Sequence, residues 1–240
     1  MKFTWRTKPE PGNFGDLLTL PIFRHFGIKV ELNKKQFEAL GTGSIIQDAL
    51  PGTRVFGSGI ITLRDEPCPH AVYEFVRGPL TRNRILECGG TCPEIYGDPG
   101  LLLPRLVPAQ HKTVDVGLVP HFVDYEIIKQ KFPNEHVVNL LNSDPMQVVD
   151  QITKCKKIVS SSLHGLVCAH AYNIPAAWIQ LSSLVKGDNA KFYDYFSCMQ
   201  IKATLSTLDN LIYTQGSIDT QPIADVLIRL ASEQQNDISQ

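Results

Sequence analysis

The sequence has no long apolar run and no excess of charge of either sign. No stretch approaches the roughly 18 consecutive apolar residues that a membrane-spanning helix requires. Its 23 Lys and Arg residues against 24 Asp and Glu residues leave a net charge of -1, which gives no field to attract nucleic acid or an anionic membrane surface. Residues 1–6 lack the apolar centre of a signal peptide. We therefore expect a cytoplasmic protein with no nucleic-acid partner and no transmembrane segment.

Cysteine is scarce and follows no disulfide or metal-binding pattern. The six cysteines lie in unlike contexts, and only Cys88 and Cys92 are close together in the sequence. A zinc site built from close cysteine pairs needs a second pair, which is missing here. We expect free thiols that are mostly buried, and neither a metal nor a cofactor.

The dinucleotide-binding fingerprint G-x-G-x-x-G is also missing, which disfavours a nicotinamide cofactor. The first half nevertheless has four strand-like runs that each end in a glycine-bearing turn, at residues 41–43, 57–59, 78 and 97–100. Glycine lets a backbone approach a ligand closely, or simply turn tightly. Four such turns at strand carboxyl ends favour a cleft lined by backbone.

The sequence does have strand-like and helical runs that alternate along most of its length. Strands are expected at residues 2–5, 28–32, 37–40, 53–56, 71–76, 94–96, 114–119 and 136–141, and on both sides of a helix at 163–172. Further helices are expected at residues 16–26 with Asp16 as a candidate cap, at 45–50, from Pro79, at 124–132, at 145–154, and once or twice after 208.

This alternation implies parallel sheets. We predict an α/β protein with two Rossmann-like halves that face a cleft, residues 1–108 and residues 109–240. The segment 104–112 has two prolines and no periodicity, so it is the predicted linker. Whether the last helices pack back on the first half is left open by the sequence.

The most informative stretch is residues 158–178, which reads as a strand, a serine-rich turn, a helix and a second strand. Ser161 and Ser162 precede the helix, where the first N–H groups lack partners, so this turn can cap the helix or hold an anion. His164 follows in the first helical turn, at the edge where open α/β sheets bind ligands. We predict that His164 is the acid–base group and that His170, on another face, is structural.

Other candidates lie at the ends of predicted strands. Arg77 is predicted to be catalytic and to bind an anion, because a guanidinium grips a carboxylate or phosphate with two prongs. Candidate acceptor or cleft residues are Asn13, Asp16, Ser58, Asp98, His121 and Lys191. Asp16 and Asp98 have capping or turn explanations that are equally good. Lys191, with Lys186, fits a solvated loop that covers the cleft.

Several motifs, in their order and spacing, resemble the polysaccharide pyruvyl transferases over most of the chain. They are Asn-Phe-Gly-Asp at 13–16, Gly-Thr-Gly-Ser-Ile at 41–45, Phe-Gly-Ser-Gly at 56–59, Val-Arg-Gly at 76–78, Gly-Asp-Pro at 97–99, Gly-Leu-Val-Pro-His at 117–121, Ser-Ser-Leu-His-Gly at 161–165, residues 169–178 and Lys-Phe-Tyr-Asp-Tyr at 191–195. One departure is Gly78, where the family commonly has an acidic residue.

The resemblance implies a GT-B-like architecture of two Rossmann-type halves. It also implies phosphoenolpyruvate as donor and a saccharide as acceptor, in a cell-surface polysaccharide or its lipid-linked precursor, with a pyruvate ketal as product. Association with a membrane would then be peripheral, through the substrate. In the family, an arginine at the position of Arg77 and a histidine at that of His164 are associated with donor binding and catalysis.

We place the donor at Arg77, Ser161, Ser162, Leu163 and His164. Two other functions remain open at this point, because a shared fold does not fix function. One is a glycosyltransferase that uses a nucleotide-sugar, and the other is a non-catalytic glycan-assembly protein.

Overall fold

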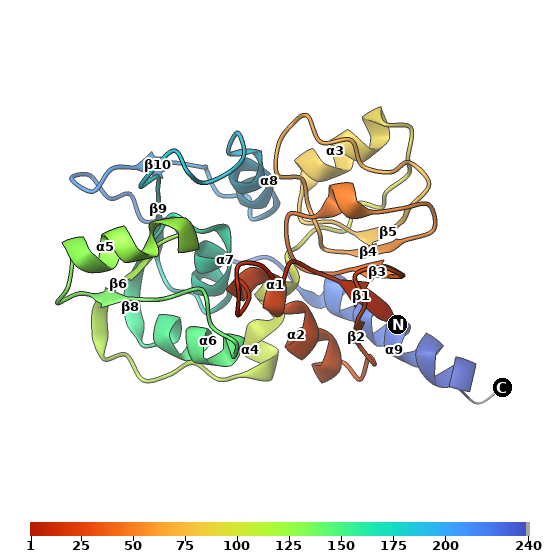
Figure 1. The fold of residues 1–240 in the computed structure, drawn as a ribbon, viewed down its shortest axis with the longest axis horizontal. Helices are drawn as coiled ribbons and strands as arrows, with labels where there is room; N and C mark the ends of the chain where they lie inside the picture. The colour runs from red at the N-terminus through yellow and green to blue at the C-terminus, as the bar shows by residue number, and fades with distance from the viewer. Residues whose placement is uncertain (239–240) are drawn as a thin grey trace.

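A computed structural model describes residues 1–238, and Figure 1 shows that they form two sheets side by side. The first sheet has the strand order β2-β1-β3-β4-β5, and all its pairings are parallel. Its strands are β1 (Lys2–Thr4), β2 (Glu31–Leu32), β3 (Ala39–Leu40), β4 (Arg54–Phe56) and β5 (Val72–Phe75). The predicted strand at 94–96 is wrong: the segment contributes only an isolated bridge between Val76 and Tyr96.

The second sheet has the order β10-β9-β8-β6-β7 and is also parallel throughout. Its strands are β6 (Val114–Val119), β7 (His136–Val137), β8 (Cys155–Ser160), β9 (Ala176–Ile179) and β10 (Leu205–Ser206). The predicted α/β architecture with two parallel sheets is therefore confirmed. β7 is shorter than the predicted 136–141, and β10 was not predicted.

Helices flank both sheets. In the first half they are α1 (Phe14–Leu17), α2 (Thr19–His25), α3 (Pro79–Glu87) and α4 (Leu103–Leu106), with 3-10 turns η1 (Ile46–Asp48) and η2 (Pro99–Leu102). In the second half they are α5 (Tyr125–Lys131), α6 (Pro145–Thr153), α7 (Leu163–Ala171), α8 (Ala190–Cys198) and α9 (Gln221–Ile238), with the 3-10 turn η3 (Phe122–Asp124). The predicted linker at 104–112 begins inside α4, because the fully buried Leu103 anchors this turn to the core.

Helix α9 returns from the second half and lies along the first sheet (Figure 1). Its Glu233 carboxylate accepts a hydrogen bond of 2.7 Å from Arg54 of β4, and its Arg229 donates one of 2.6 Å to Glu74 of β5. On its other face Ile223, Leu227 and Leu230 are fully buried. The last helix therefore covers part of the first half.

One apolar core runs through both halves. It contains Phe3 and Phe56 from the first sheet, Leu166 and Trp178 from the second half, and side chains of η2 between them. At the seam, α3 packs against α8, η2 against α7, and α1 against α6. The carboxyl ends of both sheets are therefore held at a fixed seam, where the candidate site lies.

Two further expectations concern membrane spans and cysteines in the described part of the chain. In residues 1–238 no helix has both the length and the apolar character needed to cross a membrane. The six cysteines are free, four of them buried and two half-buried, as predicted.

Candidate active site

The strand-to-helix turn at the start of α7 is held by Ser160. Its hydroxyl donates to the Val119 carbonyl at 2.7 Å and accepts the Ser162 N–H at 3.0 Å. Ser162 is the N-cap residue of α7, yet its side chain makes no capping hydrogen bond. Ser161 is also buried, and its hydroxyl accepts the His121 N–H at 2.8 Å. The turn thus gains its rigidity without using the Ser162 hydroxyl as a cap.

His164 meets a carboxylate from the other half. Its side chain is 8% exposed, and its Nε2 lies 3.3 Å from Oδ2 of the fully buried Asp98. The second oxygen, Oδ1, accepts the Gly100 N–H at 2.8 Å and caps η2. Asp98 therefore fills both roles considered for it, as a cap and as a site residue. A carboxylate beside an imidazole nitrogen orients the ring and stabilises its protonated form.

This pair is within ion-pair distance but makes no hydrogen bond in the described structure. His164 Nε2 and Asp98 Oδ2 both lack a hydrogen-bond partner there, although both atoms are buried. Buried polar atoms without partners are uncommon, and they mark places where a ligand, an ion or a small movement completes the bonding. These two atoms are therefore available for further hydrogen bonds at the seam.

Helix α1 covers the other side of the His164 ring. A Cβ on Gly15 would overlap the imidazole at Nδ1, so only glycine fits at this contact. The next residue, Asp16, is buried and accepts a hydrogen bond of 3.0 Å from the Asn13 side chain. Burial raises the pKa of Asp16, while Asn13 and His164 act in the opposite direction. The predicted N-cap role of Asp16 is wrong, because Asn13 holds that position and Asp16 lies inside α1.

Arg77, which we predicted to bind the donor anion, lies inside the protein. It has no exposed surface. Nε donates to Asp194 at 3.1 Å, Nη1 donates to Ser44 at 2.7 Å, and Nη2 donates to the Ile60 carbonyl. These bonds take three of the five guanidinium N–H donors, and the two-pronged grip on a donor anion stays a prediction. In the structure Arg77 links the two halves through its hydrogen bond to Asp194.

Asp194 of α8 is the partner that sequence reasoning missed. Its carboxylate also accepts hydrogen bonds from the Thr81 N–H and hydroxyl, at 2.9 and 2.7 Å. The departure at Gly78 has its explanation here, since a Cβ at that position would overlap the Asp194 backbone. The motif at 191–195 contained Asp194, but nothing in its spacing pointed to a partner more than 100 residues away.

Lys191 is buried in the first turn of α8, so the prediction of a solvated loop is wrong. Burial, and then the charge of Arg77, lower the pKa of Lys191 to about 8, while Asp16 opposes this shift. The shifts show that Lys191 lies near Arg77 and Asp16. The ammonium also donates weakly to the Lys186 carbonyl, at 3.4 Å. It is a cation at the seam without a carboxylate hydrogen-bond partner in the described structure.

The structure places His121 and Ser58 in different surroundings. Burial, and then the charge of Lys191, lower the pKa of the half-buried His121 to about 4, so its ring is neutral near pH 7. Its Nδ1 accepts the Val123 N–H at 3.4 Å at the start of η3. Ser58 is fully buried, and its hydroxyl bonds Gly43 and Ile45. Ser58 therefore shapes a turn and is not a cleft residue.

The structure thus gathers Asp16 and Asp98 from the first half with His164 and Lys191 from the second. A pocket of about 240 Å³ lies at the carboxyl ends of β8 and β9, and none of these four residues lines it. It is lined by Ser161, Trp178, Ile179, Gln180, Ser183, Val185, Gly187, Asn189 and Phe192. Among residues 1–238, no group of three or more His, Cys, Asp and Glu side chains could hold a metal ion.

A family model and a known protein sequence match this chain. The family model of polysaccharide pyruvyl transferase matches residues 70–183, which include Arg77, Asp98, His121 and His164. The uncharacterized protein L143 of Acanthamoeba polyphaga mimivirus is 28% identical over 213 residues, which is 80% of this chain and 74% of that protein. The predicted family resemblance is confirmed in the matched segment.

A solved structure supports the architecture. The crystal structure of the uncharacterized protein KP1_0663 from Klebsiella pneumoniae subsp. pneumoniae NTUH-K2044 is similar, with a TM-score of 0.52 and 12% identity. The match covers 86% of this chain and 92% of that one. At this identity the similarity concerns the fold, which is an open two-sheet arrangement consistent with GT-B.

Proposed function

We propose, from the match of residues 70–183 to the polysaccharide pyruvyl transferase family model, that the chain transfers pyruvyl from phosphoenolpyruvate to a sugar. The acceptor is a cell-surface polysaccharide or its lipid-linked precursor, and the product is a pyruvate ketal. The observation that carries the proposal is the contact of His164 with Asp98 at the seam of the two halves. We further propose that the enzyme is cytoplasmic, reaches a membrane only through its substrate, and uses neither metal nor cofactor.

Ketal formation sets the chemical demands on the site. The methylene carbon of phosphoenolpyruvate takes up a proton, which leaves an oxocarbenium-like centre on the neighbouring carbon. One sugar hydroxyl attacks this centre and loses its proton, the C–O bond to phosphate breaks, and a second hydroxyl closes the ring. The reaction requires a proton donor, a base for the hydroxyls and positive charge near the carboxylate and phosphate.

His164 is suited to the proton transfers. The unperturbed pKa of imidazole lies near working pH, so the ring can both give and accept a proton. The Asp98 carboxylate lies 3.3 Å from Nε2 and orients the ring. Asp16 lies on the other side of the ring, and burial raises the pKa of its carboxyl. A carboxyl with a raised pKa is a candidate base toward a sugar hydroxyl.

The positive charge comes from Lys191 in this proposal and not from Arg77. Lys191 is the buried cation without a carboxylate hydrogen-bond partner in the described structure, whereas Arg77 donates to the Asp194 carboxylate through Nε, to the Ser44 hydroxyl and to the Ile60 carbonyl. Ser162 and the first amides of α7 can take phosphate oxygens, since a helix N-terminus favours an anion. Arg77 acts indirectly, by holding α8 and therefore Lys191 in place.

The proposal is tested by incubating the full chain with phosphoenolpyruvate and a panel of glycosides, and measuring phosphate release and ketal formation. We expect stoichiometric phosphate and ketal with at least one acceptor. Protection against heat would separate the competing function on the same fold. Stabilisation by uridine or guanosine diphosphate sugars, with none by phosphoenolpyruvate, would contradict the proposal and favour a nucleotide-sugar glycosyltransferase.

A further inference from the structure

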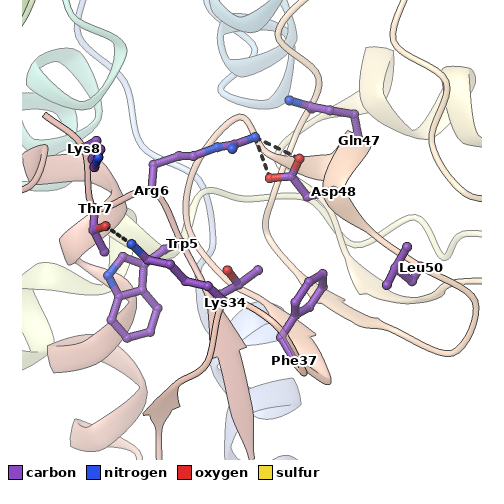
Figure 2. A pocket seen from close by; sticks show the side chains of 10 residues that line it. Trp5, Arg6, Thr7, Lys8, Lys34, Phe37, Gln47, Asp48 and Leu50 are labelled. Atoms are coloured by element: carbon purple, nitrogen blue, oxygen red, sulfur yellow. Dashed lines mark hydrogen bonds and ion pairs between the residues drawn. The ribbon is translucent and has the colours of Figure 1, made fainter.

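A second hollow, of about 580 Å³, lies on the first half and is not part of the site described above (Figure 2). Its walls are the segment that follows β1, the connection from β2 to β3, and the turn η1. It therefore opens beyond the carboxyl ends of the first strands. This edge of an open parallel sheet is where such folds bind ligands.

The hollow carries an excess of positive charge although the chain as a whole is nearly neutral. Three cations line it, Arg6, Lys8 and Lys34, against a single carboxylate, that of Asp48. The Arg6 guanidinium pairs with Asp48 at 2.6 Å, as Figure 2 shows. The other two cations have no carboxylate partner in the described structure, and Lys34 donates only to the Thr7 hydroxyl.

The remaining surface of the hollow is apolar enough to receive a sugar ring. Phe37 is half-buried and Leu50 is 56% exposed, and both line the hollow together with the edge of Trp5. The Gln47 side chain adds an amide at the rim (Figure 2). An apolar surface with a few polar groups around it is the usual composition of a small-molecule site.

The hollow lies on the same half as Asp16. Arg6, which lines it, acts electrostatically on the Asp16 carboxylate. The hollow shares no lining residue with the pocket at the end of β9.

We propose that this basic pocket, formed by Arg6, Lys8 and Lys34 around Phe37 and Leu50, binds the anionic group of an acidic saccharide. The anionic group is a phosphate or a carboxylate carried by a sugar, and its binding selects acidic acceptors over neutral ones. The role as acceptor site rests on the proposed function. The binding itself requires neither donor nor turnover.

Direct titration of the full chain tests the proposal, with galactose 1-phosphate, galacturonate and galactose as probes. We expect the two acidic sugars to bind at least about tenfold more tightly than galactose, and their affinity to fall as salt is added. The ratio of the two acidic sugars tells phosphate from carboxylate. The charge-reversed variant K8E/K34E should lose about tenfold or more in affinity for them. Lys35→Glu, at an exposed neighbour outside the pocket, should change affinity less than twofold.

Three results would overturn the basic pocket. They are equal binding of galactose and galactose 1-phosphate, unchanged affinity in K8E/K34E, and displacement of galactose 1-phosphate by phosphoenolpyruvate, which would make the hollow a donor site. A protein that binds acidic sugars through Lys8 and Lys34 but releases no phosphate from phosphoenolpyruvate would refute the proposed function. In that case the binding site would stand.

Discussion

At the scale of single residues, the contact between His164 and Asp98 makes the first prediction. His164→Ala should fold normally and lose about 10²–10⁴-fold in kcat, the usual contribution of a general acid–base group. Asp98→Asn should lose less, because an amide oxygen can still accept the Gly100 N–H while the charge beside the ring is gone. Phosphate release on the identified acceptor measures both effects.

The matched control for this pair is His111→Ala. His111 is exposed and lies in the connection between the halves, so its replacement should leave turnover unchanged. A His164→Ala variant that keeps more than half of wild-type turnover would remove His164 from the mechanism.

The pKa of Lys191 makes the second prediction. Burial, and then Arg77, lower the pKa of this lysine to about 8, so its charge in the folded protein is lost as pH rises through that value. If the ammonium attracts the donor, the KM for phosphoenolpyruvate should rise about tenfold between about pH 7 and about pH 9. In Lys191→Met, this KM should be high throughout and should no longer change with pH.

The lowered pKa of Lys191 also makes the stability of the folded protein depend on pH. Between about pH 8 and about pH 10.4 the unfolded chain holds the Lys191 proton more tightly than the folded chain does. Stability therefore rises with pH over this window through this group. Below about pH 8, where Lys191 is charged, Lys191→Met should raise the free energy of unfolding by about 1 to 3 kcal/mol, because the substitution removes a buried charge. A destabilised Lys191→Met protein would contradict this account.

At the scale of elements, the packing of α3 against α8 depends on Arg77 and Asp194. Arg77→Lys keeps a positive charge near Asp194 but loses the fork that also reaches Ser44 and the Ile60 carbonyl. We expect a loss of about 1–3 kcal/mol in the free energy of unfolding, the cost of leaving buried polar groups unpaired. Chemical denaturation measures this loss.

The kinetic pattern of Arg77→Lys separates a positioning role from donor binding. Displacement of α8 should raise the KM values of both donor and acceptor, whereas direct donor contact would raise only that for phosphoenolpyruvate. Arg24→Lys, at an exposed arginine of α2, is the matched control and should change neither stability nor KM.

Several elements could be predicted because their sequence patterns are local. Helix α7 lies within one residue of the predicted 163–172, since apolar residues there have a clear periodicity, while β8 begins at Cys155, three residues before the predicted stretch. The start of α8 was not predicted, because Lys191 was assigned with Lys186 to a solvated loop around Gly187, whereas the structure places it in the first turn of the helix.

The burial of Arg77 could not be predicted for another reason. Its position after a strand is equally consistent with a surface cation, a ligand-binding cation and a buried cation that links the two halves. The difference depends on Asp194, which the fold brings to it from 117 residues away. His164 and Asp98 were selected by residue type and strand-end position, but their contact depends on how the halves pack together.

At the scale of the whole molecule, the two halves already touch along the seam. Arg77 is paired with Asp194, and the Leu63 N–H donates to the Asp188 carboxylate at 3.0 Å. The unpaired polar atoms of His164 and Asp98 lie within the same seam. A donor bound there gains contacts with both halves, and it can favour a tighter arrangement only by binding that state better.

Hydrogen exchange with and without saturating phosphoenolpyruvate tests this arrangement and gives the last prediction. Donor binding should slow exchange in peptides that cover residues 13–18 and 160–166 together, because Asp16 and the start of α7 then share one ligand. Residues 76–81 should change little, since Arg77 is already fully buried and hydrogen-bonded without the donor. Peptides from α9, which lies along the first sheet, serve as the control. Protection confined to residues 160–166 would place the donor wholly in the second half and would remove Asp16 from the proposed site.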